Sequence, residues 1–558
     1  MPSAAYLALA QKQMGTEKQS LLIMAAGRLI YDGQWQQGLT ILAQTGDLSV
    51  ELTDEKNLLL AKVDIIRNQL RTALAHLASV RNINGLPVYY QVQFHEMLAS
   101  VYQAQGQATE SVAERIKLEN SLPDEASKAN NRRALWLSLT TLPIAELDAL
   151  AAESPDNSVL KGWVELALVS RKQYTNPQAM LAHVEQWQGQ YPNHPANHIL
   201  PSPLDSIKQR LYPAPKQMAL LLPLTGPLAG PGNAIKDGFM AEYEASRSTA
   251  FVKVRVYNTN AANSAALYQQ ALNEGADYVV GPLSKADVAT VAPLHHPVPT
   301  LLLNDLDSST QDNAYQFGLS PGNEARQVAV KARKNGYTRA LVISPGGVWG
   351  DDVVSAFAAQ WRANGGHIVD TLHYGATQDL NIAIRDFLHI TDSEARGKQL
   401  KQFLGNKLES TPSRRQDFDV IFLVAYPTKA RQIMPLLHYY YAGDIPVYAT
   451  SSVYAGSANA MKDRDLNGII FCDMPWVFTH QMGNKNWPEQ FNSYNRLYAL
   501  GMDSYALSNQ LNQLLLFPAL GIRDKSGVLY LNANQQIARI LVFGQFRQGL
   551  AQLMSENR

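Results

Sequence analysis

A cluster of prolines divides this chain into two parts with different apolar periodicities. Only Pro2, Pro87 and Pro123 occur before residue 143, whereas six prolines fall between Pro192 and Pro215. Proline fixes φ and lacks a backbone N–H group, so it ends helices and favours connecting segments. The predicted segments are a helical domain over residues 1–200, a proline-rich linker over 201–216 and a second module over 217–558.

Before the linker, apolar residues recur at helical spacing, with one stripe from Leu21 to Ile30 and another that begins at Trp35. The turn between the stripes recurs after 35 and again after 38 residues, close to the ~34-residue helix–turn–helix unit. Its copies are Gly33-x-Trp35-x-x-Gly38, Asn68-x-Leu70-x-x-Ala73, Gly106-x-Ala108-x-x-Ser111 and a degraded one at Lys172-x-Tyr174. This resembles a tetratricopeptide-like array, which favours protein binding on a concave face, although each large turn residue alone is explained by core packing.

After Lys216, short apolar runs alternate with helical stretches, as in βαβ units of an open parallel sheet. The runs expected to be strands are 218–224, 251–257, 278–282, 298–303, 340–343, 367–373, 419–424 and 445–448. They predict a two-lobed α/β module, with lobe 1 at about 217–330 and 480–522 and lobe 2 at about 331–479 and 523–558. Ligands bind at the carboxyl ends of such strands, so a crevice between the lobes is the default site.

Several segments of this module are similar to type I periplasmic binding proteins of the leucine-binding group, over residues 216–558. The segments that carry the similarity are Ala219–Ala229, Gly275–Leu283, Gly336-Tyr337 and Gly527–Gly549. A tetratricopeptide-like array joined to such a module resembles the LpoA-type outer-membrane lipoprotein activators of class A penicillin-binding proteins. This resemblance covers essentially the whole chain.

The resemblance implies a non-enzymatic regulator of peptidoglycan synthesis that binds and activates a bifunctional class A penicillin-binding protein. It implies peptidoglycan as a further partner and no cofactor. It also implies a lipidated N-terminal cysteine that anchors the protein to the periplasmic side of the outer membrane. Since the only cysteine is Cys472, this anchor is absent from the sequence, and we expect the chain to be the soluble part that follows it.

Some thirty residues separate Leu388 from Asp419, where leucine-binding proteins have a short connection. Such a long connection favours a partner-docking element, with a solvated surface helix and loop as the alternative. The docking candidates are its basic residues Lys398, Lys401, Lys407, Arg414 and Arg415. Pro412 and Ser413 should hold the two arginines outside the preceding helix, with their guanidinium groups available to carboxylates of a partner. Replacing both by Glu should therefore weaken binding and leave the fold intact.

A solute receptor is the alternative class, with an amino acid, a muropeptide or a glycan bound in the inter-lobe crevice. The residues expected near strand ends or turns of that crevice are Thr225, Ser320, Ser344, Tyr374 and Ser451. They supply no charge pair for a zwitterionic amino acid, which weighs against this alternative.

Composition and motifs argue against other classes. The chain carries 48 basic and 48 acidic residues, so it lacks the excess positive charge of a nucleic-acid-binding protein. Ser158-Val-Leu-Lys161 matches the S-x-x-K of penicillin-recognising enzymes, but no S-D-N or K-T-G accompanies it. The adjacent His295 and His296 point apart and make a poor chelate. We therefore predict no catalytic residue, no metal site and no cofactor.

Overall fold

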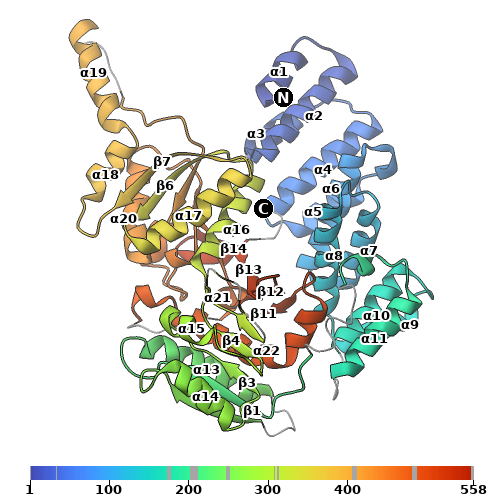
Figure 1. Cartoon of the computed structure of the whole chain (residues 1–558). Coiled ribbons are helices and arrows are strands. Elements are labelled where there is room, and N and C mark those ends of the chain that lie inside the picture. Colours follow the sequence, from blue (N-terminus) through green and yellow to red (C-terminus); the bar gives the residue numbers. More distant parts are fainter. Residues whose placement is uncertain are drawn as a thin grey trace.

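The computed structural model describes residues 2–32, 34–171, 177–200, 211–246, 252–306, 308, 310, 313–404, 411–480 and 487–554. Figure 1 shows a stack of helices along one side of the molecule and two α/β lobes along the other. This arrangement confirms the predicted fold class, a tetratricopeptide-like helical array followed by a two-lobed α/β module. The exact boundaries given for domains and lobes stay predictions.

The array consists of antiparallel helix pairs whose turns coincide with the repeated motif. Its helices are α1 (Ser3–Ala10), α2 (Gly15–Tyr31), α3 (Trp35–Ala43), α4 (Val50–Ile66), α5 (Leu70–Ala78), α6 (Val88–Ala104), α7 (Ala108–Glu119), α8 (Glu125–Thr140), α9 (Ile144–Glu153), α10 (Val159–Arg171) and α11 (Pro177–Gln190). The turn residues Asn68 and Gly106 have φ of 59° and 77°, the left-handed conformation that ends many helices. The copy at 172–174 lies outside the described residues.

The first lobe is built on a fully parallel sheet of order β2-β1-β3-β4-β5. Its elements are β1 (Gln217–Leu222), α13 (Ala229–Ser246), β2 (Lys253–Asn258), α14 (Ser264–Asn273), β3 (Tyr278–Val280), α15 (Lys285–Val291), β4 (Thr300–Leu302) and β5 (Ala314–Gln316). Ala219 of β1 pairs with Val279 of β3, and both are fully buried. The expectation that these two segments are buried strands of one parallel sheet is confirmed.

The second lobe is built on a seven-stranded sheet of order β15-β14-β10-β9-β8-β6-β7. Its elements are α16 (Pro321–Lys334), β6 (Arg339–Pro345), α17 (Val348–Ala363), β7 (His367–Tyr374), α18 (Leu380–Phe387), α19 (Ile390–Leu404), β8 (Val420–Leu423), α20 (Pro427–Tyr439), β9 (Val447–Ala449), β10 (Ile470–Asp473), α21 (Pro475–Thr479), β14 (Val542–Arg547) and β15 (Leu550–Leu553). The sequence predicts a parallel sheet, but this sheet is mixed, because β14 pairs antiparallel with β10 and β15. Only Gln548 and Gly549 separate β14 from β15, and both residues have positive φ. This tight hairpin makes β14 and β15 run antiparallel.

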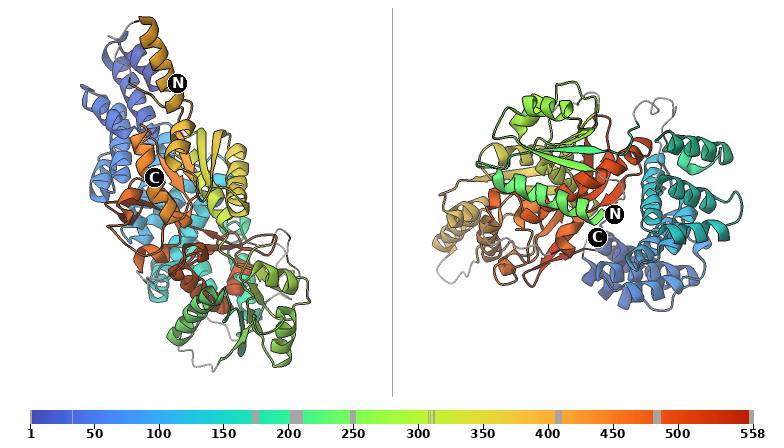
Figure 2. Two further views of the ribbon diagram at one scale, coloured as in Figure 1. Left: turned by 90° about the vertical axis from the view of Figure 1, so that its left-hand side faces the viewer. Right: turned by 90° about the horizontal axis from the view of Figure 1, so that it is seen from below.

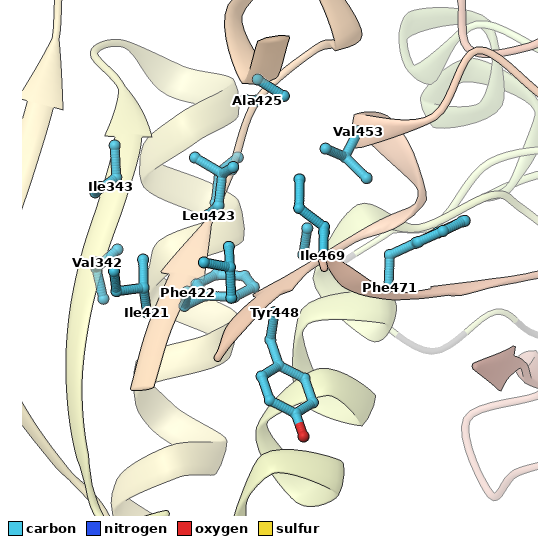
Figure 3. Close-up of a cluster of buried hydrophobic side chains, with 14 of the residues drawn as sticks. Val342, Ile343, Ile421, Phe422, Leu423, Ala425, Tyr448, Val453, Ile469 and Phe471 are labelled. Atoms are coloured by element: carbon cyan, nitrogen blue, oxygen red, sulfur yellow. The ribbon is translucent and has the colours of Figure 1, made fainter. Parts of the chain in front are cut away.

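Large apolar side chains fill both faces of this second sheet. Figure 3 shows the side chains of β6 and β8, among them Val342, Ile421 and Phe422, beside Tyr448 of β9. Phe422 stacks on Phe357 of α17 with ring centroids 4.0 Å apart. Strands buried on both faces explain why the sequence runs here are continuously apolar instead of alternating.

A shared hydrophobic core joins the array to the first lobe. The long helix α22 (Tyr494–Leu516) packs against α13, and a small antiparallel sheet follows it: β11 (Ile522–Asp524), β12 (Gly527–Leu531) and β13 (Ile537–Ile540). Trp136 of α8 lies 5.2 Å from Phe517 between ring centroids, and one buried cluster includes both with apolar residues of β1 and β3. Arg133 donates to the carbonyl of Ala519 at 2.9 Å. The part of the array from α7 onward therefore shares one core with the first lobe, whereas α1–α6 have cores of their own. Figure 2 shows the array and the lobes in two further views.

Candidate functional site

A cavity of about 300 Å³ lies between the lobes, at the carboxyl ends of β6, β8 and β9. Its volume is at the lower end of the range for small-molecule sites. The second lobe, including α16, contributes Pro321, Glu324, Trp349, Tyr426, Pro427, Ser451, Ser452, Tyr454, Ala455 and Ser457. The segment that leads into α22 contributes Trp487, Glu489, Gln490, Phe491, Asn492 and Arg496. The cavity thus occupies the edge of the sheet where the topology predicts a ligand.

Aromatic rings form much of the cavity wall. Trp349 lies in the first turn of α17, and Tyr426 immediately precedes α20. Their rings stack with centroids 4.5 Å apart and an interplanar angle of 4°. On the opposite side Trp487 lies against Gly230 of the first lobe, and its Nε1–H donates to the carbonyl of Asn492 at 2.6 Å. The second lobe and the segment that leads into α22 therefore present flat, partly exposed rings to one space.

Two carboxylates lie among these rings. Glu489 accepts a hydrogen bond from the Thr428 hydroxyl at 2.7 Å. Burial, and then the charge of Glu489, raise the pKa of Tyr426. Glu324 is 6 % exposed and accepts a hydrogen bond from the backbone N–H of Ser451 at 2.9 Å. Burial raises the pKa of Glu324. The carboxylates are thus held by a hydroxyl and backbone groups, and no ion pair joins either to a basic side chain among the described residues.

Arg496, the basic residue among the described lining residues, is engaged in a buried ion pair. Its Nη2 lies 2.6 Å from the Oδ2 of Asp473, and the two side chains are 3 % and 1 % exposed. The same Nη2 donates to the carbonyls of Ser451 and Tyr454 at 2.9 Å. Because Arg496 is on α22 and Asp473 ends β10, the pair connects the two lobes and neutralises the guanidinium charge.

The structure places one of the five predicted crevice residues, Ser451, on the cavity wall. Thr225 is exposed and accepts a hydrogen bond from Asn258, while Ser320 caps α16. Ser344 and Tyr374 are buried in the second lobe, where they contact His373 and the carbonyl of Val424. The prediction that Ser344 and Tyr374 line the crevice is wrong. Alternate side chains of a strand point to opposite faces, and these two point into the protein.

Sequence reasoning missed the aromatic lining residues. Trp349 follows β6 by four residues, after Gly346-Gly347, and Tyr426 follows β8 by three. An aromatic residue shortly after a buried strand was the available signal for both. Trp487 offered no comparable signal, because no apolar run immediately precedes it in the sequence.

The predicted docking element forms α19, which projects from the second lobe (Figure 1). Lys398 is exposed on this helix and Lys401 is half-buried, whereas Lys407 lies outside the described residues. Near the end of the helix, Phe403 is 88 % exposed and Leu400 is 49 % exposed. The helix therefore presents apolar and basic side chains together.

A comparison with known proteins places this architecture in a family. The family described as "LppC putative lipoprotein" matches residues 1–549. The chain belongs to the LppC family. Two curated relatives are each named "Penicillin-binding protein activator LpoA", and each is 28 % identical to this chain. The protein from Photobacterium profundum aligns over 98 % of this chain and 90 % of its own length, and that from Vibrio antiquarius over 97 % and 92 %.

Solved structures of Haemophilus influenzae LpoA share the LppC-family fold. One monoclinic form is 23 % identical with a TM-score of 0.51, covering 99 % of this chain and 97 % of its own. A full-length crystal structure is 22 % identical with a TM-score of 0.50, covering 99 % and 98 %. The resemblance to LpoA-type proteins inferred from the sequence is confirmed.

In this LppC-family chain the two arginines of the docking element are buried, so the expectation that they are available to a partner is wrong. The Arg414 side chain is 8 % exposed, lies 2.9 Å from Asp444 and donates to the carbonyl of Tyr441 at 2.7 Å. The Arg415 side chain is 9 % exposed and lies 2.8 Å from both Asp370 and Asp417. The segment that returns from α19 packs back on the lobe, and this packing buries both guanidinium groups.

The residues that match S-x-x-K, Ser158 to Lys161, form the start of helix α10. Ser158 accepts a hydrogen bond from the backbone N–H of Lys161 at 3.1 Å, just before α10. The hydrogen bond of Lys161 to Asp156 raises the pKa of the lysine, so its amine stays protonated and is unsuited to act as a base.

The cysteine Cys472 is fully buried in β10, and burial raises the pKa of its thiol.

Two further observations concern metals and membranes. Within the described ranges no three His, Cys, Asp or Glu side chains are grouped so that they could hold a metal ion. Across the same ranges no single helix is long and apolar enough to span a bilayer, although α8 and α9, bent by 114°, pass that length and composition test as a pair.

Proposed function

We propose that this protein binds a class A penicillin-binding protein and activates it from the periplasmic side of the outer membrane, without itself catalysing a reaction. The observation that carries this proposal is the family match along residues 1–549, together with relatives named as penicillin-binding protein activators over nearly their whole length. The name of the family, a lipoprotein, supports an envelope location. Peptidoglycan is proposed as a further partner.

The architecture supports a role as a scaffold. The array from α7 onward shares one core with the first lobe, and the buried pair of Arg496 and Asp473 ties the second lobe to α22. An activator must bind the active state of its target more tightly than the resting state. A body with fixed surfaces can do so without moving, because its contacts are already arranged for one conformation of the partner.

We propose α19 as a docking element for the synthase. Phe403 and Leu400 provide apolar area near its end, and Lys398 provides a flexible positive charge. Aromatic side chains such as that of Phe403 are enriched in the cores of protein interfaces, and a basic side chain at the rim steers the approach of an acidic partner surface. Lys401 and Lys407 stay candidates for the same contact, whereas the burial of Arg414 and Arg415 argues against them.

The test is a glycan-polymerisation assay with a purified class A penicillin-binding protein, alongside a pull-down. The unmodified chain should raise the polymerisation rate, and the double variant Phe403→Ala/Lys398→Glu should bind the synthase at least about tenfold more weakly. Lys18→Glu, an exposed change on α2, is the matched control and should behave as wild type. No stimulation by the unmodified chain would refute the activator proposal, and full binding by the double variant would remove only α19 from it.

A further inference from the structure

The inter-lobe cavity carries chemistry that the proposed activator function does not use. Of its described lining residues, Trp349, Tyr426, Tyr454, Trp487 and Phe491 are aromatic. Glu324 and Glu489 are acidic. Such a wall has π-faces and negative charge together, and both attract positive charge.

The single basic residue among those described lining residues already has a carboxylate partner. Arg496 lies 2.6 Å from the carboxylate of Asp473, and it also donates to the backbone carbonyls of Ser451 and Tyr454 and to the side chain of Asn492. A ligand carboxylate would have to displace Asp473, which is 1 % exposed on its side chain, from this pair. The lining therefore disfavours an amino acid, which brings a carboxylate as well as an amine.

Glu489 is the carboxylate that lies beside the stacked aromatic rings of the cavity. It reaches Thr428, at the start of α20. Burial and then the charge of Glu489 raise the pKa of the adjacent Tyr426, so this charge acts at the stacked pair of Trp349 and Tyr426. Its recorded partners are the hydroxyl and backbone N–H of Thr428. Both donors are neutral, and no basic side chain among the described residues forms an ion pair with this carboxylate.

We propose that this cavity binds a small organic cation, a ligand with an ammonium group and no carboxylate, against the rings of Trp349, Tyr426 and Trp487. Glu489, which is half-buried, provides the counter-charge. Glu324 is buried, and burial raises its pKa, so binding does not depend on a charge there. Because residues 487–492 and the second lobe both contribute, the ligand would contact both sides of the crevice. This inference is independent of the synthase partner.

The test uses choline and its uncharged isostere 3,3-dimethylbutan-1-ol, titrated into the full chain by isothermal calorimetry. Choline should bind with a dissociation constant below about 1 mM, and the isostere should bind at least about tenfold more weakly. Glu489→Gln keeps the acceptor for Thr428 and should weaken choline at least about fivefold while leaving the isostere unchanged. Trp349→Ala should weaken both ligands.

Glu110→Gln, an exposed substitution on α7, is the control for a non-specific loss of charge and should bind choline like wild type. Circular dichroism on each variant keeps misfolding apart from lost binding. Equal binding of choline and its isostere, no choline binding at about 10 mM, or undiminished binding by Glu489→Gln would each overturn the proposal. Tighter binding of leucine than of choline would overturn it in favour of an amino-acid site, and tighter binding of glucose in favour of a sugar site.

Discussion

Arg496 and Asp473 form the most completely buried ion pair described between the two lobes, with side chains 3 % and 1 % exposed. Arg496→Met should lower the free energy of unfolding by about 3–5 kcal/mol, because Asp473 would keep a buried charge without a partner. Urea denaturation measures the loss. Arg496→Met/Asp473→Asn, which removes both charges, should recover part of it, and a double variant no more stable than the single one would contradict this reasoning.

Arg414 and Arg415 are stabilising residues of the second lobe. Replacing both by Glu should lower the free energy of unfolding by about 2–4 kcal/mol, because new negative charges would face Asp444, Asp370 and Asp417. Thermal unfolding followed by circular dichroism measures the change. An unchanged melting temperature would restore the original expectation that these residues can be replaced without disturbing the fold.

Asp503 of α22 should give stability a distinct pH dependence. Burial, and then the charge of Asp524, raise its pKa well above the ordinary value. The folded state therefore holds this proton more tightly than the unfolded state, so the contribution of Asp503 is most favourable in acid and falls as pH rises through the folded pKa. Asp503→Asn should remove this fall. The difference in unfolding free energy between wild type and variant, measured from about pH 4 to pH 8, should change in favour of the variant as pH rises.

At the scale of elements, the crossing of α13 and α22 depends on two glycines. A Cβ on Gly501 would lie 2.0 Å from the carbonyl oxygen of Ile235, and one on Gly238 would lie 1.9 Å from that of Tyr498. Gly501→Ala should therefore cost about 1–3 kcal/mol of stability despite the better helix propensity of alanine. Gly189→Ala on α11, where a Cβ meets nothing within 4 Å, is the control and should not destabilise. Urea denaturation of both variants decides the point.

The elements themselves were largely predictable. The expected strands 340–343 and 367–373 correspond to β6 and β7, and Trp35, Leu70 and Ala108 each begin the second helix of a pair. These features depend on local periodicity and turn residues, which the sequence displays directly. The hairpin of β14 and β15 was missed, although Gln548-Gly549 marks its turn.

The candidate site was mostly not predictable, because it depends on side-chain direction and on distant partners. Strand ends located the correct edge of the sheet, but Ser344 and Tyr374 point into the protein and only Ser451 reaches the cavity. Charge counting in the insertion identified Arg414 and Arg415 without revealing that Asp444 and Asp370 meet them from other elements. Tertiary packing decides both cases.

At the scale of the whole molecule, the contact of Trp136 with Phe517 should make the array and the first lobe unfold together. Trp136→Ala should cost about 3–5 kcal/mol and separate one calorimetric transition into two, since the junction would lose its largest shared side chain. Leu77→Ala, in a core confined to the array, should lower stability without separating the transitions. Two transitions already present in the wild-type protein would contradict the prediction.

The same junction has a consequence for how the chain is made. Phe517 follows Trp136 by roughly 380 residues, so at ribosomal speed its ring is synthesised about 20–80 s later. During that interval the helix face that carries Trp136, and the first-lobe surface that α22 will cover, have no partner to bury them. Nascent chains with apolar surface exposed for so long aggregate readily. This protein should therefore depend on chaperones during biosynthesis far more than its finished stability would indicate.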